Sequence, residues 1–152
     1  MWSRKVFTEK KLMRSGVFQI LQKSDNVFSP SLTESGIDIS SYSEKLCKFA
    51  SFIVSEDDYG TSAYLAFYKN YERRQLYIPL LCVFPDHQHK GLGTMMIEYL
   101  RNEYKVEYKT IALEVLKQNE NAYEFYKKLG FGISEDRGAK FLMTLKISRE
   151  AL

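Results

Sequence analysis

The stretch from residue 80 to residue 100, LLCVFPDHQHKGLGTMMIEYL, constrains the fold of this chain more than any other. It joins an apolar run, interpreted as a strand buried on both faces, to a turn containing Gly91 and Gly93 and then to an amphipathic helix. Glycine lets a backbone approach a ligand closely, and the first amides of a helix have no partner within the helix. The stretch therefore indicates either an anion-binding loop or a plain tight turn.

Length and charge restrict the alternatives. The chain has 152 residues, of which 45% are hydrophobic, and we expect a single domain over residues 1–152. The net charge is +3, and the short basic doublets are flanked by acidic residues. That pattern is typical of solvated surface rather than of a face that follows phosphates, so we expect no nucleic acid among the partners.

The cysteines and apolar runs indicate the cellular setting, and the histidines bear on metal binding. Cys47 and Cys82 lack CxxC spacing and are interpreted as small buried hydrophobic residues in a reducing compartment. No apolar run approaches the roughly 20 residues of a membrane span, and the N-terminus lacks a signal-peptide pattern. His87 and His89 have no third ligand at a recognisable spacing, so we expect no metal site. The sequence predicts a soluble, cytoplasmic protein that does not bind membranes.

Hydrophobic periodicity predicts an α/β (α+β) fold, with a mixed, mostly antiparallel twisted sheet of about six to seven strands and helices on both faces. The expected strands are Ser3–Phe7, 51–55, 61–69, 75–84, Thr110–Leu116, Phe131–Ser134 and Lys140–Ile147. The expected helices are 8–24 with Thr8 as its cap and Met13 facing a core, 41–50, 91–104 and 119–129. Residues 26–39 are expected to form a long loop.

A second pattern follows the glycine turn. Leu113-Glu114-Val115 precedes Asn119-x-x-Ala122-x-x-x-Tyr126-Lys127-Lys128-Leu129-Gly130-Phe131. Together with Val83-x-Pro85 and Gln88-x-x-Gly91-x-Gly93, this run resembles the signature motifs of the GCN5-related N-acetyltransferase (GNAT) family over about residues 51–147. The resemblance implies a single-domain GNAT-like fold and acetyl-CoA as the co-substrate.

The resemblance also implies that main-chain groups hold the pyrophosphate and the pantetheine arm of acetyl-CoA. The expected cofactor-binding residues are Cys82, Val83, Gln88, His89, Lys90, Gly91, Leu92, Gly93, Thr94, Asn119 and Tyr126. Ligands bind open sheets where strands diverge, and a free strand edge can pair with the amides of pantetheine. Asn119 matches a cofactor-binding position and is equally natural as the N-cap of the following helix.

Tyr126 matches the general acid of the family, which protonates the departing CoA thiolate. A phenol has a reference pKa of about 10, so it is protonated at neutral pH and can donate a hydrogen bond to sulfur. The alternative is that Tyr126 is one more core aromatic residue.

The acceptor amine must lose a proton, which calls for a base. Many relatives carry a glutamate on the strand before the glycine loop, where this chain has Pro79. Glu114 resembles instead the base of relatives that acetylate protein N-termini. Two alternatives remain open, namely that Glu114 is a rim carboxylate paired with a lysine, and that water takes the proton.

The leading hypothesis is an N-acetyltransferase, a monomer or homodimer, that transfers acetyl directly to a primary amine of a small molecule or a protein N-terminus. The alternative is a catalytically silent acyl-CoA binding or sensor module, which Pro79 favours and Tyr126 disfavours. In the family, the acceptor pocket involves segments that correspond here to Asn26–Ile39 and Glu135–Ala139. Neither has a readable code. Phe28, Tyr68 and Tyr77 could form an aromatic wall, or they could equally serve packing.

Overall fold

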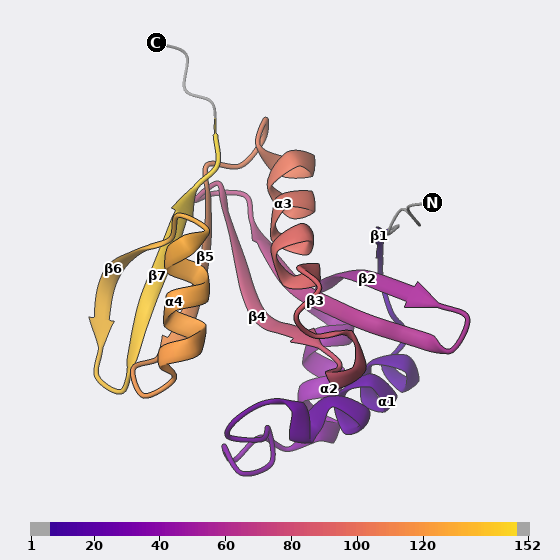
Figure 1. Ribbon diagram of the computed structural model, residues 1–152. Coiled ribbons are helices and arrows are strands. Elements are labelled where there is room, and N and C mark those ends of the chain that lie inside the picture. The colour runs from indigo at the N-terminus through magenta and orange to yellow at the C-terminus, as the bar shows by residue number, and fades with distance from the viewer. Residues whose placement is uncertain (1–6, 149–152) are drawn as a thin grey trace. The chain divides into compact units, whose positions relative to one another are not determined.

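The computed structural model describes residues 7–148 and divides the chain into two compact units. Unit 1 comprises the chain up to Phe67 together with Leu80–Ile97, and unit 2 comprises Tyr68–Pro79 together with the chain from Glu98 onward. The strands follow the order β1-β2-β3-β4-β5-β7-β6 in a seven-stranded sheet (Figure 1). Strands β4 and β5 pair in parallel, whereas β1–β2, β2–β3, β5–β7 and β6–β7 are antiparallel. The expected mixed, mostly antiparallel α/β fold is confirmed.

The helices and strands have the following bounds. The strands are β1 (Phe7–Lys10), β2 (Ser51–Asp57), β3 (Gly60–Asn70), β4 (Gln75–Val83), β5 (Thr110–Leu116), β6 (Gly132–Arg137) and β7 (Lys140–Lys146). The helices are α1 (Arg14–Ser24), α2 (Ile39–Phe49), α3 (Leu92–Tyr104) and α4 (Glu120–Lys128), with short 3-10 turns η1 (Asp25–Val27) and η2 (Pro85–His87).

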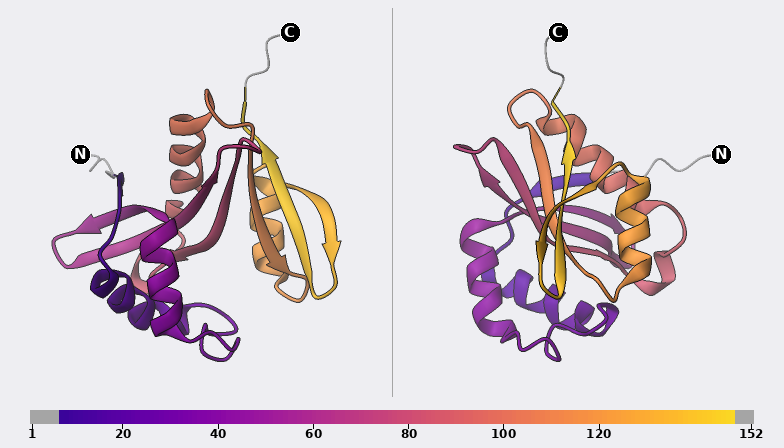
Figure 2. Two further views of the ribbon diagram at one scale, coloured as in Figure 1. Left: turned by 180° about the vertical axis from the view of Figure 1, so that it is seen from behind. Right: turned by 90° about the vertical axis from the view of Figure 1, so that its left-hand side faces the viewer.

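In unit 1, α1 and α2 cover one face of the strands and the beginning of α3 covers the other (Figure 2). Tyr64 of β3 is fully buried, and its ring packs against Phe52 and Phe84. The Tyr64 Oη and the Ser24 Oγ at the end of α1 lie 2.7 Å apart, within hydrogen-bonding distance. Because a buried hydroxyl without a partner is costly, this bond fixes α1 against the strands.

In unit 2, β5 is held on one side along its whole length. It pairs with β7 from Thr110 to Leu116, whereas its register with β4 covers only Gln75–Tyr77 against Thr110–Ala112. Pro79, two residues beyond that register, has no N–H to donate. The core of the unit consists of apolar side chains of the strands, including Leu76, Ile111, Leu113 and Leu145.

The beginning of the chain differs from the sequence-based expectation. The expected strand Ser3–Phe7 lies outside the described residues except for Phe7, which begins β1. Thr8 does not cap a helix, because it lies in β1 opposite Val54 of β2. Helix α1 begins only at Arg14, and Met13, expected to face a core, is 78% exposed. Pairing along the edge of β2 thus overrides a local helix signal.

Two further expectations need correction. Strand β4 is not buried on both faces, because its residues alternate and Leu81 and Val83 stay partly exposed. The last turn is also shorter than expected, because β6 continues to Arg137 and only Gly138 and Ala139 separate it from β7. A register shift between Ile133 and Glu135 lets β6 stay paired with β7 over this extension.

The expected long loop before α2 is organised by its own polar side chains. Ser31 and Glu34 bond each other's backbone amides through their side chains. The carboxylate of Asp25 accepts hydrogen bonds from the hydroxyl and the amide of Thr33, which lower its pKa. Within residues 7–148, no helix has the length and apolar character needed to cross a membrane.

Candidate active site

The glycine loop, residues 88–94, follows β4 and η2 and includes the first turn of α3, all within unit 1. His89 (φ 63°) and Gly91 (φ 80°) both adopt left-handed backbone conformations, which glycine tolerates and other residues rarely do. The Met95 amide donates to the Gly91 carbonyl at 3.0 Å, the bond that starts the helical pattern. The preceding amides therefore lie at the positive end of the helix without helical acceptors.

The glycine loop is fixed to β4 at its first residue. The Gln88 side-chain amide donates to the Val83 carbonyl at 2.9 Å, and the Gln88 backbone amide donates to Pro85 O at 3.3 Å. The Gln88 N–H, expected among the phosphate donors, is thus already engaged. In the part of the chain that the structure describes, the amides from His89 to Thr94 donate to no protein acceptor. These amides are suited to an anion such as a pyrophosphate.

Cys82, next to the end of β4, is a core residue. Its side chain is buried, and burial raises its thiol pKa to about 12 despite a hydrogen bond to Ser24 that lowers it. The thiol is thus neutral at physiological pH and is a poor nucleophile. Cys47 differs from the expectation, because it is only partly buried.

Tyr126 lies on α4 in unit 2. Its ring contacts those of Phe125 and Phe131 edge-on, with ring centroids 5.0 and 5.5 Å apart. The side chain is half-buried, and α4 has no fully buried residue. Burial raises the pKa of the phenol, so it stays protonated at neutral pH. Among the described residues, its hydroxyl has no hydrogen-bond partner. Tyr126 therefore carries a proton that no protein group uses, and its acid role remains a prediction.

Asn119 precedes α4 and caps it. Its side-chain oxygen accepts a hydrogen bond from the Ala122 amide at 3.1 Å, which confirms the N-cap interpretation. The cap uses the oxygen and leaves the side-chain NH₂ as a donor. A contact to the cofactor is compatible with this geometry and remains a prediction.

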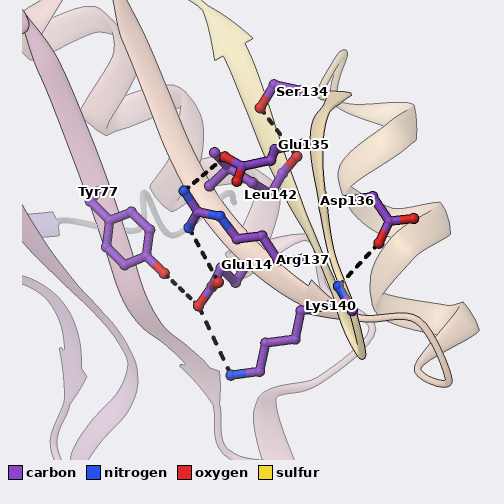
Figure 3. A network of polar contacts seen from close by, with 9 residues as sticks. Tyr77, Glu114, Ser134, Glu135, Asp136, Arg137, Lys140 and Leu142 are labelled. Atoms are coloured by element: carbon purple, nitrogen blue, oxygen red, sulfur yellow. Dashed lines mark hydrogen bonds and ion pairs between the residues drawn. The ribbon is translucent and has the colours of Figure 1, made fainter.

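Glu114 lies at the centre of a polar network formed by β4, β5 and the β6–β7 hairpin, all within unit 2 (Figure 3). Its Oε2 is 3.3 Å from Arg137 Nη1, and its Oε1 is 3.9 Å from Lys140 Nζ. The Tyr77 hydroxyl donates to the same Oε1 at 3.3 Å. Both carboxylate oxygens are therefore engaged, and the side chain keeps 27% of its surface exposed.

Tyr77 is suited to donate this hydrogen bond. Burial, followed by the charge of Glu114, raises its pKa to about 12, so it remains protonated. Its ring stacks on Tyr68 with centroids 6.5 Å apart and planes at 9°. The aromatic wall of an acceptor pocket remains a prediction. Sequence reasoning missed Tyr77 and Arg137 as partners of Glu114. The available signals were that Arg137 falls in the segment expected to contact the acceptor and that Tyr77 was expected in an aromatic wall of the acceptor pocket.

His87 and His89 do not act together in the described structure. His87 Nε2 lies 3.5 Å from Asp57 Oδ2 at the β2–β3 hairpin, and its buried Nδ1 has no partner among the described residues. His89 lies in the glycine loop. Neither geometry changes the expectation of a loop surface rather than a metal site.

The mixed α/β fold of this protein is shared with solved acetyltransferases. The structure superimposes on the ribosomal-protein-S18-alanine N-acetyltransferase from Escherichia coli with a TM-score of 0.74, at 18% identity, covering 96% of this chain and 97% of the other. The PaiA N-acetyltransferase from Thermoplasma acidophilum, solved in complex with coenzyme A, gives a TM-score of 0.69 at 21% identity, covering 93% and 99%.

Sequence comparison identifies the family. The profile of the acetyltransferase (GNAT) family matches residues 18–131, and the chain belongs to this family. A relative named probable N-acetyltransferase san, from Drosophila melanogaster, is 37% identical over 67 residues, which is 43% of this chain and 36% of that protein. The chain thus matches only about a third of that relative's length. The predicted family and the predicted acyltransferase class are confirmed.

Proposed function

We propose that this protein is an acetyl-CoA-dependent N-acetyltransferase that transfers acetyl directly to a primary amine of a small molecule or a protein N-terminus. The proposal extends to a single catalytic domain over residues 1–152 that acts as a monomer or homodimer in the cytoplasm. The glycine loop is the observation that supports it most, because a left-handed Gly91 lies within a run of unpaired amides that leads into α3. Such a run favours a pyrophosphate over a neutral ligand.

Each residue has one role in this proposal. The amides of residues 89–94 bind the pyrophosphate of the donor, and the Asn119 NH₂ donates to its pantetheine arm. Gln88 acts indirectly, because its side chain holds the loop on Val83. Acetyl-CoA supplies an activated thioester, and the buried, neutral thiol of Cys82 gives no reason to add a covalent acetyl-enzyme.

The proposed reaction is a direct transfer of acetyl from the thioester to the amine. The acceptor nitrogen bonds to the thioester carbonyl carbon, and the carbon–sulfur bond breaks. Glu114, directly or through a water, takes the proton that the ammonium loses, while Tyr126 gives its phenolic proton to the departing sulfur. After the bond forms, the nitrogen loses a second proton, which returns to Tyr126 directly or through water, and the proton on Glu114 passes to solvent. The products are the amide, the CoA thiol and one proton.

A second candidate function, a silent acyl-CoA sensor, is favoured by a specific observation. Both oxygens of Glu114 are engaged by Arg137, Lys140 and Tyr77, and Pro79 stands where many relatives carry a glutamate. A sensor would bind acetyl-CoA and lack a base that is free to act.

Two measurements on the whole protein separate these functions. The first is the shift in melting temperature caused by acetyl-CoA, since a ligand that binds only the folded state stabilises it. The second is thiol release from acetyl-CoA over a panel of primary amines. We expect both a shift and amine-dependent release. A shift without release would identify the sensor, and the absence of a shift would contradict both candidates.

A further inference from the structure

The β6–β7 hairpin places two cations on one carboxylate. Arg137 at the end of β6 and Lys140 at the start of β7 both face Glu114, and the second guanidinium nitrogen of Arg137 reaches Glu135 at 3.1 Å (Figure 3). The side chains of Arg137 and Lys140 keep 39% and 49% of their surfaces exposed. A ligand from solvent can therefore reach both cations.

These charges affect any amine that approaches Glu114. At neutral pH most alkylamines are protonated, so they reach the site as ammonium ions. Such an ion would come close to Arg137 and Lys140 and compete with them for the same two oxygens of Glu114. A plain alkylamine adds a third positive charge to a network whose two cations already share the two carboxylates of Glu114 and Glu135. The geometry therefore disfavours acceptors whose only charge is the ammonium.

Resting on the proposed function, we propose that Arg137 and Lys140 select acceptor amines that carry their own carboxylate. The acceptor carboxylate takes the place of Glu114 as the partner of the guanidinium, and Glu114 is released to accept the ammonium proton. Arginine suits this exchange because its planar fork binds carboxylates through two parallel hydrogen bonds.

The network keeps Glu114 in place during the exchange. Tyr77 donates to Oε1, whereas Arg137 binds Oε2, so the removal of Arg137 leaves the Tyr77 contact intact. Tyr77 also remains a donor throughout, because its pKa is raised to about 12, mainly by burial. The opposing interpretation is that Arg137 merely braces the hairpin, as exposed ion pairs often do with little effect.

The test compares acceptors with and without a carboxylate. The probes are alanine against alaninamide, and an Ala-Glu dipeptide amide against its Ala-Gln counterpart, assayed by thiol release from acetyl-CoA. We expect kcat/KM to favour the carboxylate member of at least one pair by about 10-fold or more, the effect of a charged hydrogen bond. Arg137→Gln should remove that preference mainly through KM, and Arg137→Lys should restore part of it.

Lys117→Gln is the matched control. Lys117 pairs with Asp136 of the same hairpin at 2.7 Å and has no contact with Glu114 among those the structure gives for the described residues. Its loss should leave the preference unchanged, and all variants should melt near wild type because these pairs are exposed.

The outcomes distinguish this inference from the proposed function. If the amines are acetylated with no preference for the carboxylate members, or if the preference survives in Arg137→Gln, the inference is wrong and the proposed function stands. If acetyl-CoA binds but no amine of a broad panel releases thiol, the proposed function fails, and the selection by Arg137 fails with it.

Discussion

The glycine loop and the Glu114 network differ in the groups that they offer to a ligand. The glycine loop offers backbone amides and depends on one local conformation, Gly91 at φ 80°. The Glu114 network offers side-chain charges and depends on two strands, β4 and β5, and on the β6–β7 hairpin, which are distant in the sequence. A loop that binds through main-chain amides suits a constant ligand. A side-chain network can be altered by single substitutions and suits a variable one. In the proposed function, the first region binds the common co-substrate and the second selects the acceptor.

Tyr126→Phe should have the largest effect on turnover while leaving the glycine loop untouched. The ring keeps its contacts with Phe125 and Phe131 and loses only the phenolic proton. We expect kcat to fall by about 100-fold or more, the usual range for a lost general acid, with the acetyl-CoA melting shift unchanged. Tyr123→Phe, on the same helix, is the control. Unchanged turnover in Tyr126→Phe would make Tyr126 a core aromatic only.

Gly91→Val should produce the next largest effect, this time on binding. The site has room for a side chain, since no atom lies within 4 Å of an added Cβ, but a β-branched residue is strained at this φ. We expect affinity for acetyl-CoA, measured by titration calorimetry, to fall by about 10- to 100-fold as the loop moves away from its binding conformation.

Gly36→Val controls for backbone strain as such. Gly36 has φ 86° and equally open surroundings, and it lies outside the glycine loop. This variant should lose stability and keep its affinity for acetyl-CoA. An undiminished affinity in folded Gly91→Val would break the comparison, because the loop would then not be the main-chain binding site.

Glu114→Gln should have a smaller effect on turnover, of about 10-fold, because water remains as a proton acceptor. Glutamine keeps the size of the side chain and removes its basicity, so the acidic limb of the kcat/KM profile should change while acetyl-CoA affinity stays near wild type. Glu135→Gln, which affects the other side of Arg137, should leave that limb as it is. An unaltered profile in Glu114→Gln would make Glu114 a rim carboxylate.

Asn119 gives the smallest effect and separates two roles of one side chain. Asn119→Ala should lose about 1 kcal/mol of stability with the cap, whereas Asn119→Ser should keep the cap and melt near wild type. Both lack the side-chain NH₂, and we expect a few-fold loss of acetyl-CoA affinity in each, measured by titration. Wild-type affinity in Asn119→Ser would restrict Asn119 to its capping role.

Local signals in the sequence predicted most of the second half of the chain. Strand β5 has the expected bounds, α3 begins one residue after its expected start, and Asn119 caps α4 as expected. In these segments, alternation, glycine and the capping residue act over a few positions and agree with one another. Near the beginning of the chain, local signals placed a helix over Thr8, which instead pairs with Val54 about 46 residues away.

The sequence by itself determined the family, the α/β class and the glycine loop, because each follows from residues that lie close together in the chain. Only the tertiary structure decided what surrounds Glu114. Tyr77, Arg137 and Lys140 come from β4, β6 and β7, and they meet only because β7 pairs with β5 along its whole length. Register between distant strands is set by the burial of one face and by long-range pairing, so no spacing in the sequence records which charges will share a carboxylate.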